Sequence, residues 1–214
     1  MTPLEGECAH KLLETALGSG IVDSAWLAEH RFHPFGTYQV EAKLVGGGQL
    51  VVWQQSDGQT FLLVNVINHW MGPEFFSRLA GVHLSTGTRG GDLYLPNPPN
   101  NLIQAFPVRT ASELWCFHNA ALQFLQTMGI GPSHERIADL PALLSNLVSE
   151  WVGYIRTKKF WRWRMPIWLL FRRRMLYGKS IQEIYARDTT VLSKTELIAR
   201  NDKANQHSAL DRWN

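Results

Sequence analysis

The sequence predicts an α+β fold: N-terminal helices, then a three- to five-stranded antiparallel meander, then a helical C-terminal half. Two observations lead to this prediction. Apolar residues change from helical spacing to alternation near residue 37 and return to helical spacing after Thr110. The 214 residues are also 45% hydrophobic and 18% charged, as in folded chains. We expect residues 1–109 and 110–200 to pack as one compact unit, with 201–214 as a frayed tail.

The first forty residues predict two helices. Apolar residues recur at helical spacing from Cys8 to Leu17, and the glycines that follow provide an end. Asp23 is placed to cap a second, shorter helix over Ser24–His30. The segment Phe32–Gly36, which contains Pro34, is expected to end that helix.

The period then becomes that of a sheet. We expect strands over Thr37–Val45, Leu50–Gln54 and Thr60–Ile67, joined by a triple-glycine turn and by the hairpin turn Asp57-Gly58. Within these strands, runs such as Leu50–Trp53 are apolar at every position. Because a strand exposed on one face alternates, we expect helices on one face and cover over part of the other.

Residues 70–108 give a mixed pattern. The sequence predicts a short helix over Pro73–Ala80, a glycine-rich loop over Ser85–Asp92, a short strand over Leu93–Leu95 and one more strand over Leu102–Val108. Between the last two, Asn97-Pro-Pro-Asn100 is expected to form a rigid polyproline turn.

From Thr110 the chain is expected to be helical. A capping box over Thr110–Glu113 opens a helix to Met128, and Asp139 caps the next helix, to about Ile155. Pro166 is expected to break or kink the chain before a helix over Ile167–Arg187. A second capping box, Ser193–Glu196, predicts a short terminal helix.

The charge of the chain is concentrated in Arg156–Lys179. This segment holds nine of the twenty-one basic residues, six aromatic residues and no acidic residue. The other 190 residues carry 12 Lys and Arg against 18 Asp and Glu, a formal charge of −6. Such a segment is typical of proteins that bind an anionic partner, a membrane surface or an acidic protein face.

On a helical wheel, Ile167, Leu170 and Phe171 share one broad face with Tyr177, Ile181, Ile184 and Tyr185. We expect this face to pack on the body of the protein. Arg174 falls within it, so we expect the guanidinium to pair with Glu150 or Asp139 on the preceding helix. Leu169 and Leu176 lie on the charged side, which makes the helix apolar on two sides.

Our main hypothesis is a non-enzymatic binding subunit that contacts nucleic acid with weak sequence preference. Arginine and lysine would contact phosphates while tryptophan stacks on bases. The residues expected at this interface are Lys158, Lys159, Trp161, Arg162, Trp163, Arg164, Arg172 and Arg173. One alternative is an assembly protein that docks the two-sided helix 167–187 on a partner subunit through Trp168, Leu169 and Leu176. Another is a peripheral protein of an anionic membrane surface, which requires Trp161, Trp163, Trp168 and Phe171 to be exposed together.

The remaining motifs favour no catalytic, metal or cofactor site. Cys8 and Cys116 are far apart in sequence and form no zinc or disulfide pattern, which favours reduced, mostly buried thiols in a cytoplasmic protein. Cys116 and His118 would point to different sides of a helix. The eight histidines lack metal-binding spacing, and no apolar run approaches the length of a transmembrane helix. We expect no cofactor and no transmembrane segment.

Overall fold

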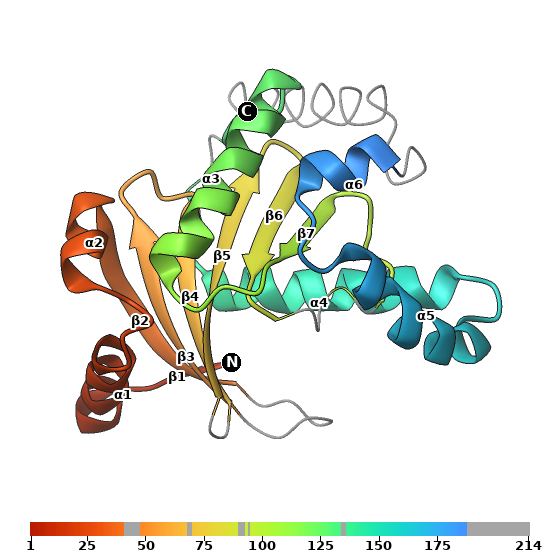
Figure 1. The fold of residues 1–214 in the computed structure, drawn as a ribbon. Coiled ribbons are helices and arrows are strands. Elements are labelled where there is room, and N and C mark those ends of the chain that lie inside the picture. Colours follow the sequence, from red (N-terminus) through yellow and green to blue (C-terminus); the bar gives the residue numbers. More distant parts are fainter. Residues whose placement is uncertain (41–47, 68–69, 90–92, 94, 134–135, 188–214) are drawn as a thin grey trace, which may run out of the picture.

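The computed structural model describes residues 1–40, 48–67, 70–89, 93, 95–133 and 136–187. Its core is one sheet of seven strands in the order of the chain (Figure 1). The strands are β1 (Thr2–Pro3), β2 (Phe32–Val40), β3 (Gly48–Gln55), β4 (Thr60–Ile67), β5 (Trp70–Leu79), β6 (Val82–Gly87) and β7 (Asn101–Ala105). The helices are α1 (Gly6–Gly18), α2 (Ser24–Glu29), α3 (Ala111–Thr127), α4 (Leu140–Thr157), α5 (Trp161–Leu176) and α6 (Ile181–Arg187).

The α+β class is correct, but the predicted strand number of three to five is too low. Strands β1 to β6 form a continuous antiparallel meander, and β7 returns parallel to β6. The helix predicted over Pro73–Ala80 is wrong, because this segment belongs to β5 and pairs with both β4 and β6. Short apolar runs fit both periods, and neighbouring strands on both sides decide the matter here. Phe75 and Phe76 are adjacent and both buried, one on each face of the sheet.

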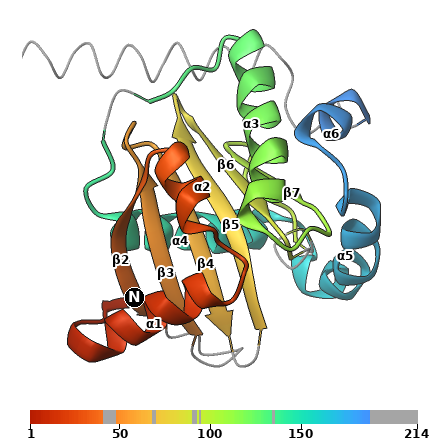
Figure 2. The same ribbon diagram turned by 60° about the vertical axis from the view of Figure 1, so that its left-hand side comes forward.

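Helices cover both faces of the central strands, as the continuous apolar runs indicate. Helices α1, α2 and α3 lie on one face and α4 crosses the other (Figures 1 and 2). Trp53, Leu62 and Phe75 are buried on the α1–α3 side, in a cluster that also holds Leu12 of α1 and Leu114 of α3. The opposite cluster is formed by Tyr38, Leu50, Val52, Phe61, Leu63, Phe76, Ile137 and Leu140.

The start of β2 differs from the prediction, and residues 41–45 at its expected end lie outside the described residues. The segment Phe32–Gly36 was expected as a break but begins the strand, with a register shift between Pro34 and Gly36. A bulge of this kind admits a proline into a sheet because the local pairing is already interrupted. The triple-glycine turn lies outside the described residues except for Gly48, the first residue of β3.

The crossover from β6 to β7 contains the loop around residues 93–100. Leu93 and Leu95 lie in a turn and a bend, so the strand predicted there is wrong, and β7 spans Asn101–Ala105 rather than Leu102–Val108. The Asn100 carbonyl accepts a 2.7 Å hydrogen bond from the His83 amide. The Trp151 indole of α4 donates to the Pro96 carbonyl at 2.8 Å. These bonds hold the loop against the α4 side of the sheet.

The C-terminal half begins with the predicted caps. Thr110 and Glu113 form a reciprocal capping box at α3, and the Asp139 side chain accepts from the Ala142 amide at α4. Pro166 does not end a helix, since α5 continues through it. The helix predicted over Ile167–Arg187 is wrong, because the chain forms two helices there, α5 and α6, separated at Gly178 with φ 78°. The positive φ ends a helix because right-handed helices require negative φ. The second capping box and the tail 201–214 lie outside the described residues.

A candidate binding surface on helix α5

Helix α5 projects beside β7 at the end of the sheet, next to the C-terminal part of α4 (Figures 1 and 2). A short turn joins the two helices, and within it Phe160 has a φ of 58°. Side chains at helical spacing are half-buried on the inner side of α5: Trp161, Met165, Trp168, Arg172 and Leu176. Leu176 packs on the apolar cluster beneath α6, which fixes the end of the helix to the body.

The outer side of α5 is apolar and exposed. Trp163 exposes 83% of its surface and Leu170 exposes 70%. We call the exposed apolar set the α5 stripe: Phe160, Trp163, Ile167, Leu170, Phe171 and Met175. From Trp163 onward, successive members are three or four residues apart or adjacent, so these five lie on one side of the helix, and Phe160 precedes them in the turn. Exposed apolar patches mark interaction sites in proteins, and the exposed Arg174 adds a positive charge on the same side of the helix.

This orientation reverses the predicted one. Ile167, Leu170 and Phe171 were expected to pack on the body and instead face outward. The physical reason is the break at Gly178, which places Ile181 and Ile184 on a separate helix, α6. These two residues are buried, but their burial does not fix which side of α5 faces the body. Arg174 is exposed and forms no ion pair with Glu150 or Asp139, so the predicted internal pair is wrong.

The predicted contact residues divide between the two sides of α5. Lys159, Arg162 and Arg164 are exposed, as are Trp163 and Leu169. Half-buried members are Lys158, Trp161, Trp168, Arg172 and Leu176. Arg173 lies on α5, but its side chain is outside the described part. The predicted nucleic-acid contact residues therefore do not form one exposed surface. Only some of their cations are exposed, and Trp163 is the exposed tryptophan among them.

Cations and rings are close together along the helix. The Lys158 ammonium lies 3.9 Å from the Tyr154 ring centroid, and Arg162 and Arg164 lie 5.4 and 5.5 Å from the rings of Trp161 and Trp168. In the described part of the chain, Arg162, Arg164 and Arg174 form no ion pair. Their charge is therefore available to an external anionic surface.

The motifs considered for catalysis lie in structural environments. Cys8 and Cys116 are both exposed, so the prediction of buried thiols is wrong. His118, two residues after Cys116, is fully buried, so Cys116 and His118 point to different sides as expected. The His118 ring is hydrogen-bonded to Ser77 and Thr86, both at 2.8 Å. Burial lowers the pKa of His118 to about 3, which keeps the ring neutral at neutral pH. Such a histidine is a structural hydrogen-bonding group rather than an exposed base.

His30 and His33, which are three residues apart in sequence, also have local partners. His30 stacks on Trp26 with centroids 4.4 Å apart, and His33 bonds to Ser56 at 2.9 Å. Among the described residues, no group of three or more His, Cys, Asp or Glu side chains is arranged to hold a metal ion. Within the same residues, no helix is both long and apolar enough to cross a membrane.

Comparison with known proteins does not assign the chain to a family. No protein family, curated protein or solved structure matches the chain.

Proposed function

We propose that the protein binds anionic membrane surfaces through helix α5. One observation carries the proposal: the α5 stripe is exposed along a helix that belongs to a segment with nine basic residues and no acidic residue. A helix lying in the membrane interface requires an apolar side that enters the acyl boundary and cations that meet the headgroups.

The membrane interpretation accounts for the aliphatic members of the stripe. Three of these members, Ile167, Leu170 and Met175, are largely exposed. Their side chains can neither bond to phosphates nor stack on bases. In a bilayer interface their burial is favourable by about 25 cal/mol per Å² of apolar surface. Each Arg or Lys close to an anionic leaflet adds about 1 kcal/mol. Trp163 also suits the headgroup region, where tryptophan is enriched.

Only part of the tryptophan arrangement expected for a membrane surface is present. Trp163 and Phe171 are exposed, whereas Trp161 and Trp168 are half-buried against the body. The exposed apolar residues of α5 instead include the aliphatic residues Ile167 and Leu170. The proposal therefore assigns insertion to the α5 stripe and leaves Trp161 and Trp168 to hold the helix in place.

The test is flotation of the full chain with phosphatidylcholine vesicles that contain or lack phosphatidylserine. We expect binding to the anionic vesicles, weaker binding to the neutral ones, and partial loss on adding salt. Leu170→Ser removes apolar surface without touching the core, so binding should fall by roughly tenfold or more. Val148→Ser is the matched control, because Val148 is an exposed apolar residue of α4 outside the stripe.

Three outcomes contradict the membrane proposal. The first is an absence of flotation with anionic vesicles, and the second is flotation that Leu170→Ser leaves unchanged. The third is concentration-dependent oligomers that Leu169→Glu abolishes in the absence of lipid, which would favour the assembly alternative.

Nucleic-acid binding is a second candidate, favoured by Trp163, which projects between the exposed Arg162 and Arg164. It predicts that affinity for single-stranded DNA falls with salt by about 0.7 in the logarithmic slope for each phosphate contacted. In that case Trp163→Ala should weaken binding and Leu170→Ser should not. That combination, without flotation, would replace the membrane proposal.

A further inference from the structure

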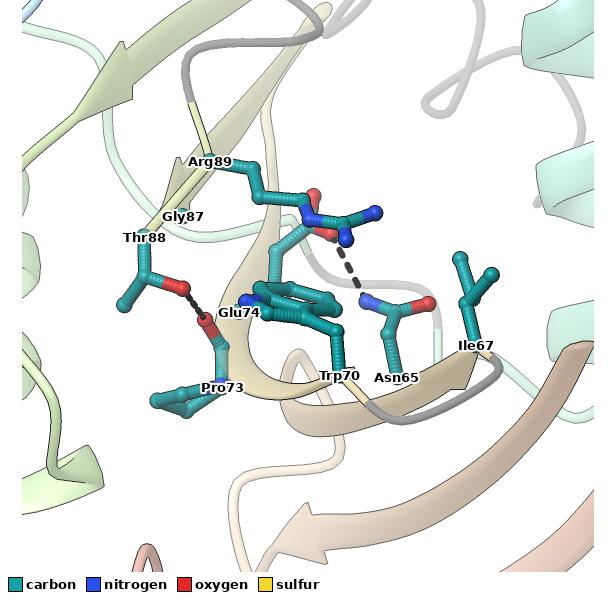
Figure 3. Close-up of a pocket in the computed structure, with 8 residues that line it drawn as sticks. All are labelled: Asn65, Ile67, Trp70, Pro73, Glu74, Gly87, Thr88 and Arg89. Carbon is teal, nitrogen blue, oxygen red and sulfur yellow. Dashed lines mark hydrogen bonds between the residues drawn. The ribbon is translucent and has the colours of Figure 1, made fainter.

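A small cavity opens on the α4 side of the sheet, at the ends of β4, β5 and β6 (Figure 3). Its volume is about 250 Å³. The lining residues are Asn65, Ile67, Trp70, Pro73, Glu74, Gly87, Thr88 and Arg89. It is smaller than the cavities of roughly 300–1,000 Å³ that hold drug-sized ligands, so it suits a small metabolite.

Arg89 is held flat at one side of this cavity. Its guanidinium carbon lies 3.4 Å from the Trp70 ring centroid. The indole in turn lies over Gly72, where an added Cβ would stand 2.3 Å from Cζ2 of Trp70. Glycine at position 72 therefore lets the ring lie against the strand and present its other face to Arg89. Stacking fixes the plane of a guanidinium while leaving its edge donors available.

No hydrogen bond or ion pair joins Arg89 to any other described residue. Five N–H donors are thus oriented by stacking without a protein acceptor in the described part of the chain. An arginine held in this way is prepared for two parallel hydrogen bonds to a carboxylate or a phosphate.

Glu74 supplies a negative charge to the same cavity. Its carboxylate accepts from the Ser85 hydroxyl and, at 3.4 Å, from the Asn65 amide. Gly87 is the residue paired with Glu74 across β5 and β6, and an added Cβ there would be 3.7 Å from Cγ of Glu74. A carboxylate has about four acceptor sites, so a ligand donor can join the groups that orient it.

The two opposite charges line one small cavity, and no ion pair joins Arg89 to Glu74. We propose that this cavity binds a small zwitterion. Its carboxylate or phosphate contacts Arg89, and its ammonium group contacts Glu74 and the Asn65 side-chain carbonyl. A zwitterion contacts both side chains at once, whereas a simple anion or a simple amine contacts one.

Calorimetric titration of the full chain tests this with matched probes. The zwitterions are β-alanine and O-phosphoethanolamine, and the singly charged counterparts are acetate, methyl phosphate and ethanolamine. We expect one zwitterion to bind at least about tenfold more tightly than its singly charged counterparts, since each charged contact adds of that order. Comparing the two zwitterions distinguishes a carboxylate site from a phosphate site.

Variants connect the binding to the residues. Arg89→Ala should abolish binding of the preferred zwitterion, and Glu74→Gln should reduce its affinity to that of the simple anion. Gly72→Ala should weaken binding by displacing the Trp70 ring without removing a charge. Arg109→Ala is the control, because Arg109 is exposed and does not line this cavity. Circular dichroism of each variant confirms that the fold is kept.

The proposal is overturned if no zwitterion binds. It is also overturned if methyl phosphate or acetate binds as tightly as its zwitterion and Glu74→Gln has no effect, because the cavity would then be an anion site. The result is independent of vesicle binding, since no member of the α5 stripe lines the cavity.

Discussion

Each hydroxyl around His118 is the donor for one neighbour and the acceptor for another. Gln104 donates to Thr86 at 2.9 Å, and Thr86 and Ser77 each bond to the His118 ring at 2.8 Å. Ser77 then meets Thr60 at 2.9 Å, and Thr60 donates to Asp57 at 3.3 Å. Every hydrogen finds an acceptor when His118 is neutral with its proton on Nε2. A second ring proton would face Thr86 and reverse that order.

The first prediction at the residue scale concerns acid. Burial lowers the pKa of His118 to about 3, while an unfolded histidine titrates near 6.5. Below about pH 6.5 the unfolded state therefore binds more protons, and the free energy of unfolding should fall as pH decreases towards 3. His83, whose pKa burial and then Arg78 lower to about 4, adds to the same slope.

Two measurements check this prediction. Urea unfolding at pH 7 and pH 5 should show lower stability at pH 5, a range above the ordinary titration of carboxylates. An NMR titration should show that the His118 ring stays neutral throughout this range. A His118 resonance that titrates near pH 6.5 in the folded protein would contradict the assigned network.

At the scale of elements, Gln104 is the residue that ties α6 to the sheet. Its side chain is fully buried on β7. It donates to the Phe117 carbonyl of α3 at 3.2 Å and accepts from the Ile181 amide at 2.9 Å, at the start of α6. Three elements, β7, α3 and α6, therefore share one amide. Because α5 is joined to α6, this contact also helps to position the α5 stripe.

We predict that Gln104→Ala lowers the free energy of unfolding by about 2–4 kcal/mol. The loss combines an unpaired buried amide with a cavity in the core. Hydrogen exchange at the Ile181 amide should accelerate more than exchange in β3 and β4. Gln182→Ala, at an exposed position of α6, is the control and should change stability by less than about 0.5 kcal/mol. Equal effects of the two substitutions would show that Gln104 does not anchor α6.

The elements also show what the sequence can predict. Capping boxes and hairpin turns depend on neighbouring residues, so Thr110, Asp139 and Asp57-Gly58 are recognisable without tertiary information. The segment Pro73–Ala80 is different, because its run of apolar residues fits a helix as well as a strand. Only pairing with β4 and β6 makes it β5.

The candidate sites follow the same division. The charge of 156–179 is visible in the sequence, but the direction of the apolar side of α5 depends on the break at Gly178. Trp70, Gly72 and Glu74 of the cavity share one face of β5, a pattern of alternation that the predicted helix concealed. Arg89 reaches the cavity from the next loop, which only the folded chain brings to that place.

At the scale of the whole molecule, the sheet separates two apolar cores. Leu62 faces the cluster under α1–α3, and the adjacent Leu63 faces the cluster under α4. Helix α4 lies between α3 and α5 in the chain, and it covers the face of the sheet opposite α3 (Figure 2). Helix α5 directly follows α4 in the chain. The stability with which α4 packs on the sheet therefore affects how firmly α5 is held.

We predict that Leu62→Ala and Leu63→Ala each cost about 2–5 kcal/mol, because both side chains are almost completely buried, at 0% and 4% exposure. If the sheet and both helical layers form one cooperative unit, urea unfolding of each variant is a single transition with the wild-type slope. Val148→Ala, at an exposed position of α4, should cost less than about 0.5 kcal/mol. A loss below about 1 kcal/mol for Leu63→Ala, or a separate early transition, would mean that α4 docks weakly. Helix α4 would then detach from the sheet before the sheet itself unfolds. In that case vesicle binding through α5 should persist at urea concentrations where α4 is already detached.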